Sequence, residues 1–593
     1  MGGASNDVAG REPSASRGPG PGSDVMGWRT GGFLLAGSAA VSAAIAVFLW
    51  RFGFSPWLPA AWLGALALLV GAACPRGALT RVGAALREHP WWWAGLLCLA
   101  CVPVFVRLAN VSLAFTHPDE FALAWFSRQY SFRSTNFFGP IPPEPVWTFQ
   151  SPSLYFVIQK AMLALLGFAP LDVKLSTLPF VLVTGVALFL GARALFGATV
   201  GALAVAVYAF LAPSVYAESF GVPNTMSTAF LVVFFVCAVD HYRRPAPGPS
   251  VAVGLTCALC YLAYSSSYSA APLMLVVAAL SILRAPGRLV AKTVAISLAT
   301  ALIVLLPFVI GAARSSDYFL HRITQTVPIA ARALGEAVPP EDVSRARSQL
   351  AANWVANCRY FWRDDVGGTA GFNFGHRALL DPVSLVFLVA GVVLSFGMAG
   401  HRRELLPVLA FVAINILSLG FANPPPHITR LANLFPFIAM FMALPAAWVV
   451  RPGGAHRALR AVVAVGLLGT VVGCNLRHLG VAKSADVRQG REDYDDIKIA
   501  LYLKEHCADE EIRVAAFGGF HLEYTLRFFL PGSTIVTDYH DHILRAFDRD
   551  RDRVYVILFP DEFNARFLGA DPEGQLITNV SRKYSLFLSH VRR

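Results

Sequence analysis

The stretch that decides the fold runs from Trp91 to Glu120 and reads WWWAGLLCLACVPVFVRLANVSLAFTHPDE. Its first part, residues 91–109, is an apolar run close to the length of about 20 residues that a bilayer-spanning helix needs. Two adjacent carboxylates, Asp119 and Glu120, follow this run closely. Because charged side chains beside the hydrocarbon layer are costly, near membranes they tend to mark functional sites. The stretch therefore predicts a membrane-crossing helix with chemistry at the membrane surface.

The composition of the 593-residue chain extends this interpretation to the whole protein. Apolar residues make up 55% of the chain and charged residues only 15%, which is typical of a polytopic α-helical membrane protein. We expect about 13 spanning helices, at residues 31–50, 57–74, 91–109, 176–192, 198–214, 224–240, 250–264, 268–283, 293–312, 382–399, 405–422, 431–450 and 461–477.

Lysines and arginines indicate the orientation, because short cytoplasmic loops carry an excess of these residues. Basic residues follow every second predicted span, at Arg76, Arg81, Arg87, Arg193, Arg243, Arg244, 284–292, Arg402, Arg403 and 451–460. This places the N-terminus in the cytoplasm, provided that the apolar stretch 154–168 does not cross the bilayer. Residues 110–175, 313–381 and 478–593 then lie on the extracytoplasmic side. The net charge of +12 mostly reflects this topology and gives little support to nucleic-acid binding.

Composition also divides the chain into segments. Residues 1–28 are rich in Gly, Ser and Pro and predict a disordered cytoplasmic tail. Residues 29–90 hold two spans, 91–480 form the main transmembrane domain, and 481–593 are more charged. In the last segment, a helical pattern at 494–505 and strand-like runs at 512–517, 534–538 and 554–559 predict a small extracytoplasmic α/β domain. The richness in Ala, Arg and Gly favours a bacterial source, and hence the inner (cell) membrane.

Seven of the nine cysteines lie in or at the ends of predicted spans, where cysteine usually acts as a small apolar residue. Cys358 and Cys507 lie on the extracytoplasmic side, and the sequence leaves open whether they form a disulfide, because it does not give their separation.

Several polar residues fall on the extracytoplasmic side of this topology. They are Asp119 with Glu120, then Glu218 with Asn224 after the fifth span, and His427 with Arg430 in a later turn. A carboxylate in such a set can accept a proton as a general base. The planar guanidinium of arginine suits a phosphate group. We therefore expect one site at the outer membrane face.

These residues resemble those of the GT-C membrane glycosyltransferases, in particular family 39, the relatives of protein O-mannosyltransferases and aminoarabinose transferases. His117-Pro118-Asp119-Glu120 is similar to the acidic motif that opens the first large extracytoplasmic loop of that family. Residues 150–155, QSPSLY, resemble its Pro-Pro-Leu-Tyr segment, and residues 193–197, RALFG, its cytoplasmic turn between early spans. Residues 430–436 resemble the Arg-containing start of a late helix. The resemblance covers roughly residues 91–593 and leaves two N-terminal spans outside it.

The resemblance implies a sugar donor linked to a polyprenyl or dolichyl phosphate that enters from the lipid. Asp119 would deprotonate an acceptor hydroxyl on a lipid, glycan or protein, and the attack would invert the anomeric carbon. Glu120 would tune Asp119 or touch the acceptor. Arg430 would neutralise the leaving phosphate, with Lys160 as a helper, although the position of Lys160 favours a lysine that snorkels to the interface.

Three questions stay open at this stage. Glu218 and Asn224 compete for the second acidic position of the family. The sequence identifies no certain cofactor, and it leaves open whether the protein binds a divalent metal ion. The candidate ligands, hard or borderline in type, are His117, Asp119, Glu120 and Glu218. His427 is a further candidate for substrate contact. The alternative functions are a transporter or flippase of a lipid-linked or small solute, and an inactive scaffold of the same fold. The absence of internal repeats disfavours the transporter.

Overall fold

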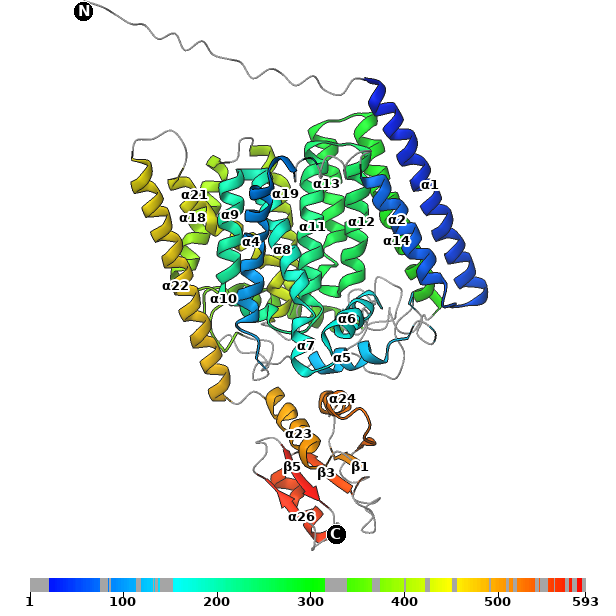
Figure 1. Ribbon diagram of the computed structural model, residues 1–593, viewed down its shortest axis with the longest axis vertical. Coiled ribbons are helices and arrows are strands. Elements are labelled where there is room, and N and C mark those ends of the chain that lie inside the picture. The colour runs from blue at the N-terminus through cyan, green and yellow to red at the C-terminus, as the bar shows by residue number, and fades with distance from the viewer. Residues whose placement is uncertain are drawn as a thin grey trace, which may run out of the picture.

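The structure is a computed structural model in which a tall helical bundle stands on a small C-terminal α/β domain (Figure 1). The residues that the structure describes are 21–74, 84, 87–112, 119–131, 133, 137–138, 153–314, 339–364, 374–398, 402–421, 427–450, 456–489, 492–507, 511–515, 520–538, 543, 553–558, 560–570, 575–578 and 584–588.

Within the described residues, the helices of the bundle overlap the spans predicted from the sequence. They are α1 (Pro21–Phe52), α2 (Leu58–Ala73), α4 (Pro90–Leu108), α8 (Leu178–Phe196), α9 (Ala198–Phe210), α11 (Asn224–Arg243), α12 (Pro247–Ala263), α13 (Ala270–Arg284), α14 (Arg288–Arg314), α18 (Pro382–Met398), α19 (Leu406–Ser418), α21 (Phe435–Val449) and α22 (Arg457–Gln489). The first of them, α1, begins inside the segment 1–28 that the sequence predicts to be a disordered tail.

The length and apolar content of each helix determine whether it can cross a membrane by itself. Within the described residues, seven helices are long and apolar enough, and the bent pair of α9 and α10 (Ala212–Glu218) makes an eighth. Six more apolar helices are shorter. The protein is therefore an integral membrane protein with many spans, and the number 13 stays a prediction.

Local sequence explains how the helices begin and turn. Several helices, α2, α4, α8 and α12 among them, have proline at the first or second helical position, where a missing N–H is not needed. Gly197 joins α8 to α9 with a φ of 97°, a left-handed conformation that favours glycine. This turn is the RALFG segment, and Figure 1 shows it at the end of the bundle far from the C-terminal domain.

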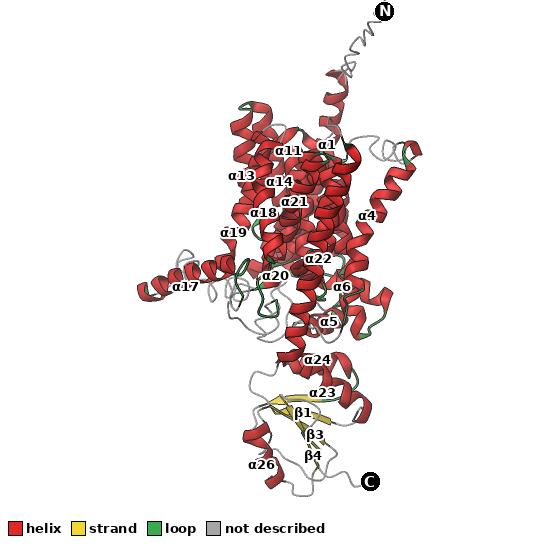
Figure 2. Cartoon of the chain, turned by 90° about the vertical axis from the view of Figure 1, so that its left-hand side faces the viewer, coloured by secondary structure: helices red, strands yellow, loops and turns green. Residues whose placement is uncertain are grey.

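Short helices gather at the opposite end, which faces the C-terminal domain. They are α5 (Glu120–Gln129), α6 (Ser153–Leu166), α7 (Pro170–Leu175), α10, η1 (Ser265–Ser267), η3 (Leu419–Phe421), α20 (Ile428–Leu431) and η4 (Ala432–Leu434), and a further 3-10 turn, η2 (Arg402–Leu405), precedes α19. Helix α6 covers most of the apolar stretch 154–168, and Figures 1 and 2 place it at this end of the bundle. That this stretch does not cross the bilayer stays a prediction. We call the end of the bundle that faces the C-terminal domain the Asp119 end.

The C-terminal domain contains a five-stranded mixed sheet in the order β2-β1-β3-β5-β4. Strands β1 (Glu511–Ala515), β2 (Ile535–Asp538) and β3 (Arg553–Leu558) pair in parallel, whereas β5 (Tyr584–Leu588) pairs antiparallel with β3 and with β4 (Gln575–Ile577). The helices of this domain are α23 (Glu492–His506), α24 (Phe520–Phe529) and α26 (Pro560–Ala570). The predicted α/β domain is thus present, and its described residues contain two strands and two helices more than the sequence indicated.

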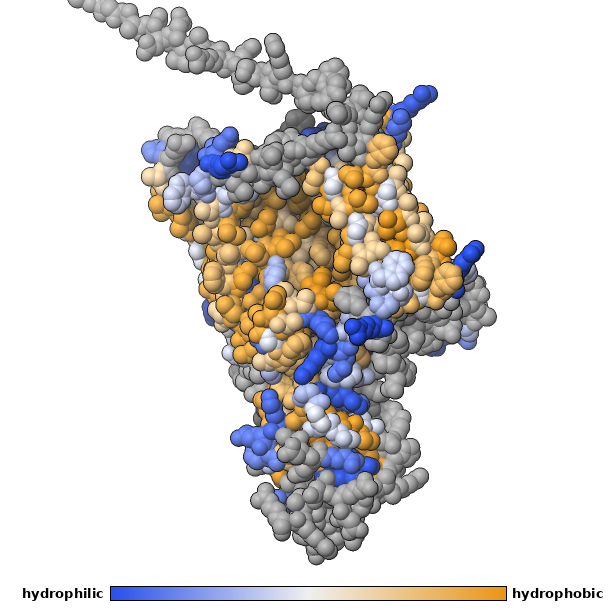
Figure 3. Space-filling model, turned by 45° about the vertical axis from the view of Figure 1, so that its right-hand side comes forward, coloured by the Kyte–Doolittle hydropathy of each residue, from blue (hydrophilic) through white to orange (hydrophobic). Residues whose placement is uncertain are grey.

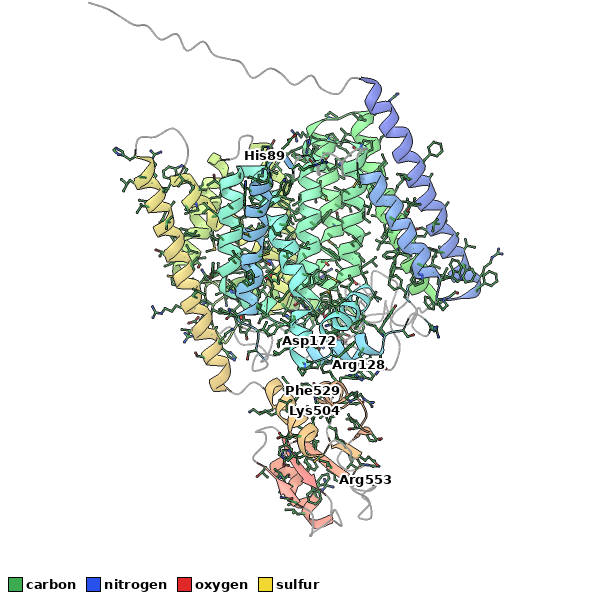
Figure 4. All side chains as sticks on the ribbon, viewed as in Figure 1. His89, Arg128, Asp172, Lys504, Phe529 and Arg553 are labelled. Atoms are coloured by element: carbon green, nitrogen blue, oxygen red, sulfur yellow. The ribbon has the colours of Figure 1, made fainter. Side chains whose placement is uncertain are left out.

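The C-terminal domain packs directly on α5, the helix that begins beside Asp119. A shared apolar cluster joins Phe121, Leu163 and Val173 of the bundle to α23, α24 and the sheet. The Phe121 ring lies 5.3 Å from the Phe528 ring and 5.0 Å from the Phe529 ring, centroid to centroid. Figure 4 shows Phe529 on the face of the domain that meets the bundle. The two parts therefore share a core.

The surface of the bundle matches a membrane environment. Figure 3 shows an apolar face along most of its height, with hydrophilic side chains gathered where the bundle meets the C-terminal domain.

All nine cysteines are free thiols, and Cys358 and Cys507 are among them.

Candidate functional site

The acidic pair lies at the start of α5. Asp119 is half-buried and occupies the N-cap position, and Glu120, the first helical residue, is fully buried. The Glu120 carboxylate accepts a hydrogen bond of 2.9 Å from Lys174 Nζ of α7, and neither side chain is exposed. It also accepts 2.7 Å from the backbone N–H of Gly221. His117 lies outside the described residues. Glu120 therefore fixes the first turn of α5 against two other segments.

Gly221 contacts residues of three helices, α5, α6 and α7. Its carbonyl oxygen accepts hydrogen bonds from the Tyr155 hydroxyl at 2.9 Å and from the Gln159 amide at 3.4 Å. A Cβ at this position would lie 2.6 Å from the Val173 carbonyl oxygen and 2.9 Å from the nearer carboxylate oxygen of Glu120. Only glycine fits this approach without displacement of the backbone.

The hydroxyl of Tyr155 keeps its proton in this position. Burial, reinforced by the nearby Glu120 carboxylate and by Tyr264, raises the pKa of Tyr155 well above its ordinary value. Tyr155 is the last residue of the QSPSLY segment, and of that segment residues 153–155 are described. The tyrosine therefore acts as a hydrogen-bond donor that holds the Gly221 turn.

Glu218 belongs to a separate buried ion pair with Arg107 of α4. The guanidinium contacts a Glu218 carboxylate oxygen through Nε at 3.0 Å and through a terminal nitrogen at 2.9 Å. It also donates to Ser214 Oγ and to the carbonyl oxygens of Tyr208 and Ala209. These carbonyls belong to the last turn of α9, and their bonds stabilise the 63° bend before α10.

The Tyr208 hydroxyl completes this set, since it lies 2.8 Å from both carboxylate oxygens of Glu218. The side chains of Arg107 and Glu218 are 0% and 1% exposed. The Glu218 carboxylate thus accepts hydrogen bonds from Arg107 of α4 and from Tyr208 of α9. The geometry therefore gives Glu218 a part in holding the broken helix, and substrate or metal contact stays an untested expectation.

A chain of hydrogen bonds connects the Gly221 turn to the segment of Arg430. Asn224 donates through its amide to the Thr429 carbonyl oxygen at 3.0 Å, and the Thr429 hydroxyl lies 3.0 Å from His427 Nδ1. The backbone N–H of His427 donates to Asn357 of α17 (Pro340–Arg359) at 3.2 Å. The structure thus joins, at one end of the bundle, segments that the sequence predicts to be extracytoplasmic.

Arg430 and Lys160 occupy different places at this end. Arg430 is half-buried at the third residue of α20, one residue beyond Thr429. Lys160 Nζ donates to the carbonyl oxygens of Arg128 and Tyr130 at the C-terminal end of α5. Helix α5 has 10 residues and is therefore about 15 Å long. Lys160 caps the end of α5 that lies farthest from Asp119.

Two residues that the sequence interpretation missed, Lys174 and Arg107, neutralise the buried carboxylates. Each is a basic residue at the edge of an apolar helix, and buried charges are generally paired. That signal was present in the sequence, but the partners lie 54 and 111 residues away along the chain. Within the described residues, no group of three or more His, Cys, Asp or Glu side chains is arranged to hold a metal ion.

Comparisons with known proteins place the fold. No protein-family model matches the chain, and no curated protein matches it. Among solved structures, the archaeal oligosaccharyltransferase AglB from Archaeoglobus fulgidus, in complex with an inhibitory peptide and a dolichol-phosphate, is similar with a TM-score of 0.50 and 12% identity. The match covers 81% of this chain and 71% of that one.

Two further structures are similar. The apo form of the Archaeoglobus fulgidus enzyme has a TM-score of 0.50 and 12% identity, over 80% of this chain and 71% of that one. ArnT from Cupriavidus metallidurans bound to undecaprenyl phosphate has a TM-score of 0.44 and 14% identity, over 84% of this chain and 98% of that one. The likeness to AglB shows that the chain has the GT-C glycosyltransferase fold.

Proposed function

We propose that the protein is an inverting glycosyltransferase that moves a sugar from a polyprenyl-phosphate donor to an acceptor hydroxyl at the extracytoplasmic membrane face. One observation carries the proposal: Asp119 and Arg430 lie in segments joined by hydrogen bonds at one end of a bundle with the GT-C fold. The AglB structure with dolichol-phosphate supports a lipid-phosphate donor for this fold.

The chemistry assigned to Asp119 is general-base catalysis. Its carboxylate takes the proton of the acceptor hydroxyl while the acceptor oxygen bonds to the anomeric carbon from the face opposite the phosphate. The bond between the anomeric carbon and the phosphate oxygen breaks, and its electron pair leaves with the lipid phosphate. Inversion at the anomeric carbon follows from this single displacement. A positioned carboxylate base contributes a factor of roughly 10² to 10⁴ to the rate.

We assign the leaving phosphate to Arg430. A guanidinium makes paired charge-assisted hydrogen bonds to phosphate oxygens, and the Asn224–Thr429 contact holds its segment beside the Gly221 turn. Lys160 stays a second phosphate candidate, although its bonds to the end of α5 suit a capping role better.

Glu120 is assigned a positioning role within this proposal. Its carboxylate is held by Lys174 and Gly221, so it orients the first turn of α5, from which Asp119 projects. For the second acidic position of the family, two contacts are relevant: Asn224 donates to the backbone of the Arg430 segment, whereas Glu218 is paired with Arg107. The assay that follows measures which sugar is transferred, whether the acceptor is a lipid, glycan or protein, and whether transfer depends on a metal ion.

The function is tested by label transfer in vesicles. Purified protein is incubated with a panel of radiolabelled polyprenyl-phosphate sugars and an envelope extract, with and without a metal chelator. We expect transfer from at least one donor, and Arg430→Gln should raise the donor KM about tenfold or more, because a hydrogen bond to a charged group is worth about 1.5–3 kcal/mol.

Two controls sharpen this test. Arg430→Lys keeps the charge but loses the planar fork, so its donor KM should lie between those of wild type and Arg430→Gln. Arg244→Gln changes an exposed arginine just beyond α11, at the other end of the bundle, and should leave the donor KM unchanged. Absence of transfer and of donor hydrolysis with every sugar would contradict the proposed function.

A further inference from the structure

Helix α5 lies between the bundle and the C-terminal domain, with Asp119 at its N-cap position. On the bundle side, Glu120 is paired with Lys174, and Leu123 and Phe126 belong to the apolar core of the bundle. A helix of only 10 residues is marginal in water by itself. The position of α5 therefore depends on the surfaces that pack against it.

The other side of α5 is covered by α24 of the C-terminal domain, and Figures 1 and 2 both show these two helices next to each other. The Phe121 side chain is 1% exposed, because its ring meets the rings of Phe528 and Phe529. One turn further along α5, the Trp125 ring lies 5.3 Å from the Tyr524 ring, centroid to centroid. The domain thus buries the outer side of the helix that begins beside the acidic pair.

A second group of contacts extends this packing along α5. The Tyr524 ring also lies 4.9 Å from the Phe126 ring. The guanidinium carbon of Arg527 lies 5.7 Å from the centre of the Trp125 ring, and its Nε donates to the Glu523 carboxylate at 2.9 Å. The contact with α24 therefore covers both the first and the second turn of α5.

We propose that the C-terminal domain positions Asp119 for the general-base step. Phe528 and its neighbours press α5 against the bundle, where Lys174 and Gly221 hold its first turn, and this fixes the point from which Asp119 projects. The inference rests on the proposed function. It makes Phe528 a positioning residue, since Phe528 acts on the reaction through α5.

The transfer kinetics of Phe528→Leu test the inference, with Phe567→Leu as the matched control. Phe567 is also buried in the C-terminal domain, but it belongs to a separate cluster with Tyr555 and Phe587. For Phe528→Leu we expect kcat to fall about tenfold or more with little change in donor KM, because a misplacement of about 1 Å can cost about 100-fold in rate. At a temperature where circular dichroism shows all proteins folded, Phe567→Leu should keep a kcat close to that of wild type.

A second comparison asks whether Phe528 acts through Asp119. Once Asp119→Asn has removed the base, Phe528→Leu should lower the remaining rate no further, because residues that act as a unit are not additive. A loss of the same size in both backgrounds would overturn the inference. Equal losses of kcat in Phe528→Leu and Phe567→Leu would also overturn it.

Hydrogen exchange of the full-length protein in micelles provides a test that does not need transfer. The backbone amides of α5 should exchange faster in Phe528→Leu than in Phe567→Leu, because α5 loses packing in the first variant alone. Phe121→Leu removes the opposite ring of the same contact and takes the place of Phe528→Leu if that variant does not fold. Unchanged exchange in α5 would overturn the inference, whereas a wild-type protein that transfers no sugar would contradict the proposed function, so the two failures are distinguishable.

Discussion

Replacing Arg107 by Met removes the cation from the buried pair that holds the bend between α9 and α10. The Glu218 carboxylate, whose side chain is 1% exposed, then keeps its bonds to the Tyr208 hydroxyl but loses both contacts to the guanidinium. The Tyr208 and Ala209 carbonyl oxygens lose the same donor. The perturbation therefore affects a charge and two backbone groups together.

The expected magnitude follows from the burial of both partners. Removal of one member of a buried ion pair costs about 3–5 kcal/mol, because the remaining charge is left uncompensated. We expect a loss in this range for Arg107→Met, and also for Glu218→Gln, which leaves the guanidinium without an anion. In the double variant both charges are absent, so its loss should be smaller than the sum of the single losses by about 0.5–3 kcal/mol.

The assay is reversible unfolding of the purified protein in mixed micelles, followed by far-UV circular dichroism. The matched control is Arg244→Met, which breaks an exposed pair with Asp240 one turn away on α11. An exposed pair is worth about 0–1 kcal/mol, so this control should have nearly wild-type stability.

Two results would refute the reasoning about this pair. The first is a stability change in Arg107→Met no greater than that in Arg244→Met. The second is strict additivity of the single losses in the double variant, since additivity would mean that Arg107 and Glu218 do not interact.

Three further predictions concern the supports of the site. Gly221→Ala should cost about 1–3 kcal/mol by overpacking and should lower transfer, whereas Gly480→Ala, with open space around the new methyl group, should not; thermal unfolding and transfer rate measure both. Phe529→Ala should cost about 3–5 kcal/mol and speed proteolysis between bundle and C-terminal domain; an unchanged cleavage rate would contradict the shared core. Burial alone would raise the pKa of Glu511, but hydrogen bonds and positive charge from Arg513 and Arg553 outweigh burial and lower this pKa below its ordinary value. The ionised Glu511 therefore stabilises the fold at neutral pH, and this contribution is lost as the pH falls through the lowered pKa. Glu511→Gln should flatten the profile of stability against pH in acid unfolding.

The membrane fold was predictable from the sequence because each helix of the bundle carries its own apolar run. The orientation drawn from the basic residues requires that the stretch 154–168 does not cross the bilayer, and this requirement stays a prediction; α6 lies at the Asp119 end. Strands β4 and β5 were missed because they are only three and five residues long. The pairing of β5 with β3 and of β4 with β5 is a tertiary effect that a short run does not reveal.

The candidate site stays a prediction, and the sequence indicates the side of the membrane for its residues more readily than their contacts with one another. Sidedness alone brought Asp119, Asn224, His427 and Arg430 to one end of the bundle. The ion pairs and the Gly221 turn depend on contacts between residues far apart in sequence, and a single sequence contains no record of such separations. Burial, which decides whether a carboxylate is structural or reactive, likewise becomes known only from the packed chain.

The central claim is that Asp119 is the general base of a sugar transfer from a polyprenyl phosphate. The most direct test is the transfer rate of Asp119→Asn relative to wild type at saturating donor, with unfolding curves to show that both are folded. The account predicts a decrease of roughly 10² to 10⁴ with little change in donor KM. A rate close to that of the wild-type protein would contradict it.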